Sequence, residues 1–211
     1  MGCPMPRRIM FMGDSITAQA SPNNYYEYLF YQLLLQNYDV QAVGSSNGFV
    51  IHGVTTYFEG HPGFQTYQLE VERYIPTAFP AAPPDTILLY IGVNDLFQLG
   101  TAGTPNAGTI TAQRLRHLMQ RIYSVQPAVK VFVAQISPVR VGGAWAAVIG
   151  SELETYNSLI PSVVRPYGER AAVLDFFTGY DAVNWFTDDV HPDFRGAQSN
   201  ARAARRQGFP D

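Results

Sequence analysis

Five short apolar segments, separated by stretches with helical periodicity, constrain the fold of this 211-residue chain more than any other feature. Each segment has the length and apolar content of a strand. The predicted strands are Ile9–Met12, Tyr38–Val43, Asp85–Ile91, Ala128–Ile136 and Ala171–Asp175. The predicted helices are Tyr25–Asn37, Gln65–Tyr74, a segment from Thr109 or Thr111 to Val125, and Glu152–Val164. Because strands that alternate with helices pair in parallel, we expect an α/β fold, a three-layer α/β/α sandwich around a central, mainly parallel five-stranded sheet.

Length and composition fit a single domain over residues 1–211 and argue against several classes of partner. The chain is 46% hydrophobic and 15% charged, which is ordinary for a globular protein. A formal net charge of −3 argues against a general nucleic-acid or anionic-membrane binder. No apolar run approaches the roughly 18–20 residues of a membrane span, so we expect none. A single cysteine, Cys3, excludes an intramolecular disulfide and a CxxC metal site.

The N-terminal segment says little about localisation. Residues 1–8 contain no apolar stretch before the first predicted strand, so we expect no signal peptide in this chain. The Met1-Gly2 start suggests myristoylation, but Pro6 stands where that signal needs Ser or Thr. Localisation therefore stays open, because the mature form of a secreted protein would look the same.

A serine follows the first predicted strand, in the sequence Gly13-Asp14-Ser15. Open α/β sheets place their ligand crevice at the carboxyl ends of strands, and Gly13 permits a sharp turn there. Taken alone, Asp14 and Ser15 read more simply as a helix cap. A polar amide also follows the third strand, in Gly92-Val93-Asn94-Asp95, although Asn and Asp favour turns as well.

Near the C-terminus, Asp188 precedes His191 by three residues on a short polar turn. At this spacing the carboxylate can accept the imidazole Nδ1–H, which leaves Nε2 to face another group. That is the arrangement of base and orienting acid in a catalytic triad. A lone histidine is more often structural, so this pair alone does not establish an active site.

A second serine, Ser46, lies in Gly44-Ser45-Ser46-Asn47-Gly48, which matches the G-x-S-x-G nucleophile elbow. That elbow requires a helix directly after the serine. The following Phe49–Thr56 segment is β-branched and broken by glycine, which makes it a poor helix. We therefore expect a glycine turn, or a loop that presents the Gly44 amide, rather than a nucleophile at Ser46. A further loop is expected at Glu59–Gly63, with His61 exposed.

In chain order, the Gly13-Asp14-Ser15, Gly44, Gly92-x-Asn94-Asp95 and Asp188-x-x-His191 motifs resemble the four blocks of the SGNH, or GDSL-type, hydrolase superfamily. The resemblance covers residues 8 to about 194. Within the superfamily the chain is most similar to the carbohydrate esterase family three acetylxylan esterases. The matching stretches are Val43–Ser45, Glu59–Gly63, Val131–Ile136 and Asp188–Pro192. The resemblance implies a flavodoxin-like SGNH fold and, if the chain is a mature form, secretion.

Carried over by position, the resemblance makes Ser15 the nucleophile, His191 the general base and acid, and Asp188 its orienting group. The Ser15 N–H, the Gly44 N–H and the Asn94 side-chain amide would form the oxyanion hole, where donors must already face the developing negative charge. The implied reaction is hydrolysis of short-chain carboxylic esters through an acyl-enzyme, with carbohydrate such as acetylxylan as the acetylated substrate. No cofactor and no metal are implied.

Further positions have less defined roles. Tyr25, Tyr26 and His61 are candidate contacts in an aromatic sugar site, although they fit core or surface positions equally well. Asp14 and Asp95 are expected to brace strand ends and turns. The Asp193–Asp211 segment lacks the bulky apolar residues that the family has after its histidine, so we expect a loosely packed tail.

Other functions fit parts of the sequence. A lipid esterase, a lysophospholipase or a thioesterase could use the same scaffold, with a long apolar groove for its substrate. A non-catalytic carbohydrate-binding or scaffold protein is a further alternative, but the presence of all four blocks argues against it. A nucleotide-binding Rossmann domain is disfavoured because the first strand is followed by neither G-x-G-x-x-G nor G-x-x-x-x-G-K-[ST].

Overall fold

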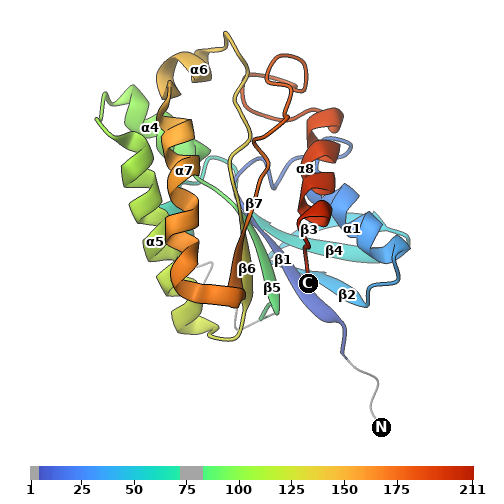
Figure 1. The fold of residues 1–211 in the computed structure, drawn as a ribbon. Coiled ribbons are helices and arrows are strands. Elements are labelled where there is room, and N and C mark those ends of the chain that lie inside the picture. Colours follow the sequence, from blue (N-terminus) through green and yellow to red (C-terminus); the bar gives the residue numbers. More distant parts are fainter. Residues whose placement is uncertain (1–4, 72–82) are drawn as a thin grey trace.

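The computed structural model describes residues 5–71 and 83–211. Helices cover both faces of one central sheet, with α4, α5 and α7 on one side and α1 and α8 on the other (Figure 1). The strands are β1 (Arg7–Gly13), β2 (Val40–Val43), β3 (Ser46–Ile51), β4 (Val54–Gly60), β5 (Thr86–Tyr90), β6 (Lys130–Ala134) and β7 (Ala171–Leu174). The helices are α1 (Tyr25–Leu35), α2 (Thr66–Val71), α4 (Val93–Thr101), α5 (Ala107–Val125), α6 (Ala144–Ile149), α7 (Glu152–Val164), the 3-10 helix η1 (Arg165–Arg170) and α8 (Phe194–Arg206).

The α/β sandwich with a mainly parallel sheet is confirmed, and all five predicted strands are present. β1 pairs in parallel with β5, β5 with β6, and β6 with β7. The other edge of β1 is shared, because Arg7–Met10 pairs with β2 and Met12–Gly13 pairs with β4. The carboxyl ends of β2, β4, β1 and β5 therefore lie side by side at one edge of the sheet.

Within the described residues, the sheet has seven strands rather than the predicted five, because β3 and β4 form a hairpin that was not predicted. Its two-residue loop is His52-Gly53, and both residues have positive φ, as tight hairpin turns require. The segment predicted as an irregular loop at Glu59–Gly63 therefore begins inside a strand, since Glu59 and Gly60 pair with the tip of β1.

The helices α4 and α6 were not among the predicted ones. Helix α4 starts directly after Gly92, so Asn94 and Asp95 belong to its first turn rather than to an isolated turn. Gly92 has a φ of 130° and packs against Tyr156 so closely that a side chain would overlap the ring. Helix α6, which carries Trp145, lies in a segment for which no helix was predicted. Both helices stand over the carboxyl end of the sheet (Figure 1).

The expectation of a loose C-terminal tail is wrong. Asp193 caps α8 by accepting hydrogen bonds from the backbone amides of Arg195 and Gly196. The buried face of α8 consists of small residues, mainly alanines, which let the helix approach α1 closely. The large apolar side chain that α8 lacks is supplied by Phe209, which follows the helix and is fully buried against Phe11 and Phe132.

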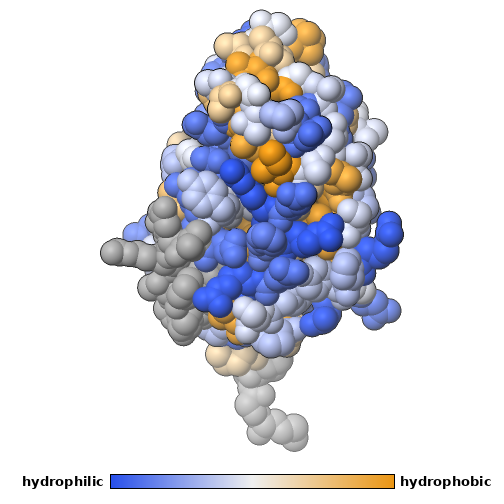
Figure 2. Space-filling model, turned by 90° about the vertical axis from the view of Figure 1, so that its left-hand side faces the viewer, coloured by the Kyte–Doolittle hydropathy of each residue, from blue (hydrophilic) through white to orange (hydrophobic). Residues whose placement is uncertain are grey.

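The surface and the N-terminus add little to the functional picture. Hydrophilic side chains gather across the middle of the face covered by α4 and α5, and apolar ones toward the end that carries α6 (Figure 2). Within residues 5–71 and 83–211, no helix has the length and apolar character needed to cross a membrane. Cys3, the Met1-Gly2 start and the predicted end of a helix at Tyr74 lie outside the described residues.

Candidate active site

The tip of β1 turns sharply and projects Ser15 toward the carboxyl edge of the sheet. A Cβ on Gly13 would overlap the Tyr90 carbonyl, so only glycine fits beside β5 at this point. Asp14 then forms the turn, since its Oδ1 accepts the Ile16 amide at 3.0 Å and its carbonyl accepts the Ala18 amide at 3.1 Å. Asp14 therefore braces the turn, as predicted, and Ser15 is left partly exposed.

The 188–191 turn brings its histidine to this serine. The Asp188 Oδ1 accepts the backbone amides of Val190 at 2.8 Å and His191 at 2.7 Å, which fixes the turn. The Asp188 Oδ2 lies 2.7 Å from the His191 Nδ1. The His191 Nε2 lies 2.8 Å from the Ser15 Oγ. The structure thus brings Asp188, His191 and Ser15 into one hydrogen-bonded relay.

The charge on Asp188 favours one tautomer of His191. Partial burial acts to raise the pKa of the Asp188 carboxyl, but hydrogen bonds from the amides of His191 and Val190 and from the imidazole outweigh it. The pKa is held below its ordinary value of 3.8, so Asp188 is ionised at neutral pH. An ionised carboxylate accepts the Nδ1–H, which leaves Nε2 able to accept the Ser15 hydroxyl proton.

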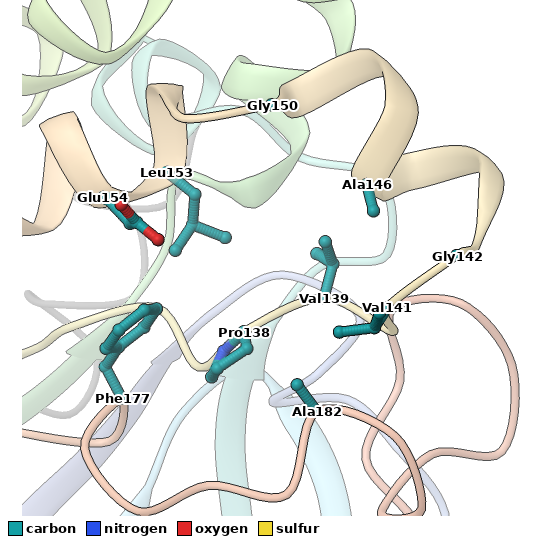
Figure 3. Close-up of a pocket in the computed structure, with 10 residues that line it drawn as sticks. All are labelled: Pro138, Val139, Val141, Gly142, Ala146, Gly150, Leu153, Glu154, Phe177 and Ala182. Atoms are coloured by element: carbon teal, nitrogen blue, oxygen red, sulfur yellow. The ribbon is translucent and has the colours of Figure 1, made fainter.

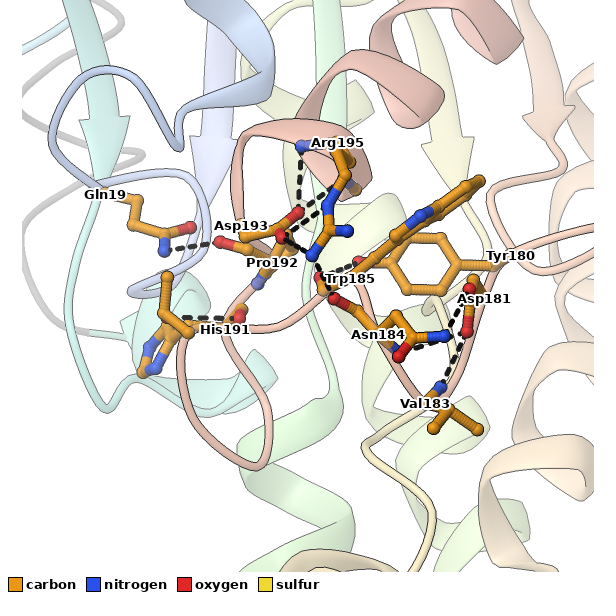
Figure 4. Close-up of polar contacts among 12 residues, drawn as sticks. Gln19, Tyr180, Asp181, Val183, Asn184, Trp185, His191, Pro192, Asp193 and Arg195 are labelled. Carbon is orange, nitrogen blue, oxygen red and sulfur yellow. Dashed lines mark hydrogen bonds and ion pairs between the residues drawn. The ribbon is translucent and has the colours of Figure 1, made fainter.

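Contacts that sequence reasoning missed hold the histidine turn from both sides. The Gln19 side chain donates to the Pro192 carbonyl at 2.8 Å (Figure 4). The Thr187 amide donates to the His191 carbonyl at 2.9 Å. On the far side, Asp189 accepts the Ala144 amide at 2.8 Å, which ties the turn to the start of α6. No motif marks Gln19 or Ala144, because each contacts the turn from a distant part of the sequence.

The predicted oxyanion donors, Ser15, Gly44 and Asn94, stand at the ends of three adjacent strands. Gly44 follows β2 and packs on the Phe58 backbone so closely that any side chain would overlap it. Asn94 lies in the first turn of α4, and its Nδ2 donates to the Phe64 carbonyl at 3.0 Å. An amide nitrogen carries two hydrogens, so this bond leaves one for another acceptor.

Asp95, next to Asn94, braces the start of α4 as predicted. Its carboxylate is fully buried and accepts the Thr66 amide at 2.7 Å, the Thr66 hydroxyl at 2.9 Å and the Arg114 guanidinium at 2.8 Å. Burial raises the pKa of Asp95, and the contacts with Arg114 and Thr66 oppose that effect. These bonds join α2, α4 and α5 beside Asn94.

Two of the predicted substrate contacts are wrong. Tyr25 and Tyr26 lie on the face of α1 that packs against the sheet, and both are buried in an aromatic cluster with Phe11. Burial raises the pKa of both phenols well above 10. These tyrosines therefore belong to the core and cannot line a sugar site.

His61 and Ser46 also differ from simple loop residues. The His61 side chain is only 13% exposed, because its Nε2 lies 2.6 Å from the buried Glu59 Oε1. The prediction of an exposed loop histidine is therefore wrong. Ser46 begins β3, opposite Phe58 on β4, so no helix follows it and the context of a nucleophile elbow is absent.

A separate apolar cavity of about 350 Å³ lies between the loop after β6, the helices α6 and α7, and the loop that carries Phe177 (Figure 3). Its lining consists mainly of aliphatic side chains, with Glu154 as the one carboxylate among the described residues that line it. The described lining contains neither Ser15 nor His191. Among the described residues, no group of three or more His, Cys, Asp and Glu side chains is arranged to hold a metal ion.

Comparisons with known proteins agree with this geometry. The crystal structure of a carbohydrate esterase family 3 from Talaromyces cellulolyticus is 22% identical, with a TM-score of 0.77 over 95% of each chain. A Clostridium thermocellum family 3 carbohydrate esterase is 24% identical, with a TM-score of 0.75 over 95% of this chain and 94% of the other. These structures share the fold of this chain.

Sequence comparison identifies the family itself. An Acetivibrio thermocellus protein described as "Putative endoglucanase X" is 32% identical over 82 residues, which are 39% of this chain. The chain spans only 29% of that protein's length. The profile of the GDSL-like Lipase/Acylhydrolase family matches residues 11–198, which include the β1 tip and the histidine turn. The chain therefore belongs to the GDSL-like lipase/acylhydrolase family.

Proposed function

We propose that this chain is a serine esterase that hydrolyses short-chain carboxylic esters through an acyl-enzyme. The observation that carries the proposal is the relay from Asp188 through His191 to Ser15, with distances of 2.7 and 2.8 Å. A serine hydroxyl is a weak nucleophile until an adjacent base removes its proton. The relay supplies that base in the required tautomer.

In the proposed reaction, the Ser15 Oγ attacks the ester carbonyl while His191 Nε2 takes the hydroxyl proton. The carbonyl oxygen becomes an oxyanion that accepts hydrogen bonds from the Ser15 N–H, the Gly44 N–H and the Asn94 amide. Asp188 stabilises the imidazolium. The tetrahedral intermediate then collapses, the C–O bond to the alcohol breaks, and His191 protonates the leaving alcohol. The acyl group remains on Ser15.

Water completes the cycle by the same route. His191 removes a proton from a water molecule, whose oxygen attacks the acyl carbon. The bond to Ser15 Oγ breaks, the proton on His191 returns to Ser15, and the carboxylic acid leaves. Besides the ester and water, the proposed steps use side chains and backbone amides of this chain.

For the substrate, we propose an acetyl ester of a carbohydrate such as acetylxylan, as a small molecule or a polysaccharide. Two features support this choice. The Glu59–Gly63 and Asp188–Pro192 stretches resemble the carbohydrate esterase pattern. The second stretch carries Asp188 and His191, and the first donates the His61 amide to the Gly13 carbonyl beside the nucleophile turn. The structural neighbours named above are described as carbohydrate esterases.

The test is hydrolysis of p-nitrophenyl acetate and of acetylated xylan by the wild-type chain, Ser15→Ala and Ser46→Ala. The proposal predicts turnover of both substrates, lost in Ser15→Ala and largely kept in Ser46→Ala. Loss in Ser46→Ala with activity kept in Ser15→Ala would contradict the assigned nucleophile. Turnover of p-nitrophenyl acetate alone would reject the carbohydrate substrate and direct the search to lysophospholipids and thioesters.

A further inference from the structure

A buried carboxylate beside the candidate active site has contacts that the proposed reaction does not use. Glu59, at the end of β4, is fully buried. Its Oε2 accepts the Ser45 backbone amide at 2.7 Å, and its Oε1 accepts the Ser45 hydroxyl at 3.0 Å. The same Oε1 lies 2.6 Å from the His61 Nε2. Three donors thus converge on one carboxylate, a number that its lone pairs can satisfy.

The first two contacts fix the Gly44 backbone. Glu59 holds both the amide and the hydroxyl of Ser45, so the peptide that joins Gly44 to Ser45 has little freedom to rotate. Gly44 also packs directly on the backbone of Phe58, the residue before Glu59. Strand β4 therefore constrains the backbone on both sides of the Gly44 Cα, next to the peptide whose N–H is one of the proposed oxyanion donors.

The third contact leads to the Asn94 amide. The His61 backbone amide donates to the Gly13 carbonyl at 2.9 Å, which ties this loop to the nucleophile turn. The His61 carbonyl accepts the Phe64 amide at 3.1 Å, and the two rings pack with centroids 5.0 Å apart. The Phe64 carbonyl in turn accepts the Asn94 Nδ2 at 3.0 Å.

We propose that Glu59 and His61 are positioning residues that hold two of the three proposed oxyanion donors, the Gly44 N–H and the Asn94 amide, in one rigid network. The inference rests on the proposed function, because it assigns a purpose to the same site. Neither side chain needs to touch the ester. Their effect on the rate follows from geometry, since an oxyanion hole works only when its donors are aligned before the charge develops.

The principal test is Glu59→Gln, which keeps the size of the side chain but replaces one acceptor oxygen by a donor. With p-nitrophenyl acetate, kcat should fall by about 10- to 100-fold, while KM stays within about twofold, because the lost interaction acts in the transition state. Glu169→Gln, which changes an exposed glutamate before β7, is the matched control and should leave both constants unchanged.

A double-mutant cycle separates positioning from a general structural role. If Glu59 acts through the oxyanion donors, the fold-loss caused by Asn94→Ala should be clearly smaller in the Glu59→Gln background than in the wild type. If the two losses in kcat multiply, Glu59 does not act through Asn94, and the proposed network is wrong.

A second pair of variants covers the case in which Glu59→Gln does not fold. His61→Gln places an amide donor close to the position of the imidazole Nε2, whereas His61→Ala removes the donor. The network predicts that His61→Ala lowers kcat by about tenfold or more and that His61→Gln recovers most of that loss. Equal activity of both variants would overturn the role of His61.

Failure of this inference is distinguishable from failure of the proposed function. If the Ser15→Ala variant remains active, the proposed serine esterase function is wrong, and the positioning role falls with it. If Ser15→Ala is inactive but folded Glu59→Gln and His61→Ala keep the wild-type kcat, the proposed function stands and only the positioning role is wrong.

Discussion

At the scale of single residues, Asp188 determines which nitrogen of His191 carries the proton. Its carboxylate accepts three N–H donors, two of them backbone amides that hold the turn and one from the imidazole. The same carboxylate therefore shapes the turn and selects the tautomer. The sequence suggested the second role through the Asp-x-x-His spacing.

Asp188→Asn should lower kcat for p-nitrophenyl acetate by about 10³–10⁴-fold, with little change in KM. The asparagine amide can donate to Nδ1, which moves the ring proton to Nε2 and removes the base that Ser15 needs. Asp39→Asn, which changes an exposed aspartate at the opposite edge of the sheet, serves as the control. A loss of less than tenfold in folded Asp188→Asn would argue against His191 as the base.

Asp14 links the nucleophile turn to the pH dependence of stability. Burial is the main factor that raises its pKa from 3.8 to about 7; the Ile16 amide opposes this, and the Asp95 charge adds to it. Between these two values the folded chain binds a proton that the unfolded chain releases. The free energy of unfolding should therefore fall as the pH rises from about 4 to 7.

Asp14→Asn removes the group that titrates, so the free energy of unfolding of this variant should fall less as the pH rises from about 4 to 7. Urea unfolding of the wild type and the variant at several pH values in this range measures the free energy of unfolding of each. The wild type should lose more stability than the variant between the two ends of the window. Parallel curves would show that the Asp14 carboxyl does not titrate there.

At the scale of elements, the sequence predicted the strands that consist mainly of apolar residues. The strands β1, β2, β5, β6 and β7 were all predicted, whereas β4, which also pairs in parallel with β1, was missed. The β3–β4 hairpin was missed because its His52-Gly53 turn lacks the usual Asn-Gly or Asp-Gly signal. Without that hairpin, the pairing of Glu59 with His61 and with Ser45 could not be foreseen.

Helices were missed for a different physical reason. The first turn of α4 contains Asn94 and Asp95, which also favour turns, and the helix packs against α5 and α7, which its own sequence does not reveal. In α8 the contact surface is made of alanines, which look like a solvated face in a sequence pattern. Tyr25 and Tyr26 show the converse, because a helical stripe of tyrosines fits a binding face and a core face equally well.

The packing of the C-terminal segment gives a prediction at this scale. Phe209→Ala should lower the free energy of unfolding by about 3–5 kcal/mol, because the ring is fully buried between Phe11 and Phe132. Phe194→Ala removes a ring that is 47% exposed and should cost much less. Urea unfolding of both variants makes the comparison, and equal costs would contradict the docking of this segment.

At the scale of the whole molecule, the proposed catalytic groups lie together at one edge of the sheet, although Ser15 and His191 are 176 residues apart in the sequence. Ser15, Gly44 and Asn94 follow β1, β2 and β5, whose carboxyl ends are neighbours because the strands are parallel. His191 arrives from the loop before α8, so the docking of that helix fixes the base. The four sequence blocks predict that Ser15, Gly44, Asn94 and His191 lie close together. The proposed network of Glu59 and His61 depends on contacts that only the folded chain shows.

The most direct measurement of the central claim is covalent labelling of the nucleophile. The native chain is treated with a fluorophosphonate, and the modified residue is located by peptide mass spectrometry. The account predicts one modification, on Ser15, which is absent in His191→Ala because the hydroxyl then has no base. Labelling of Ser46, or unchanged labelling of Ser15 in His191→Ala, would contradict the relay from Asp188 through His191 to Ser15.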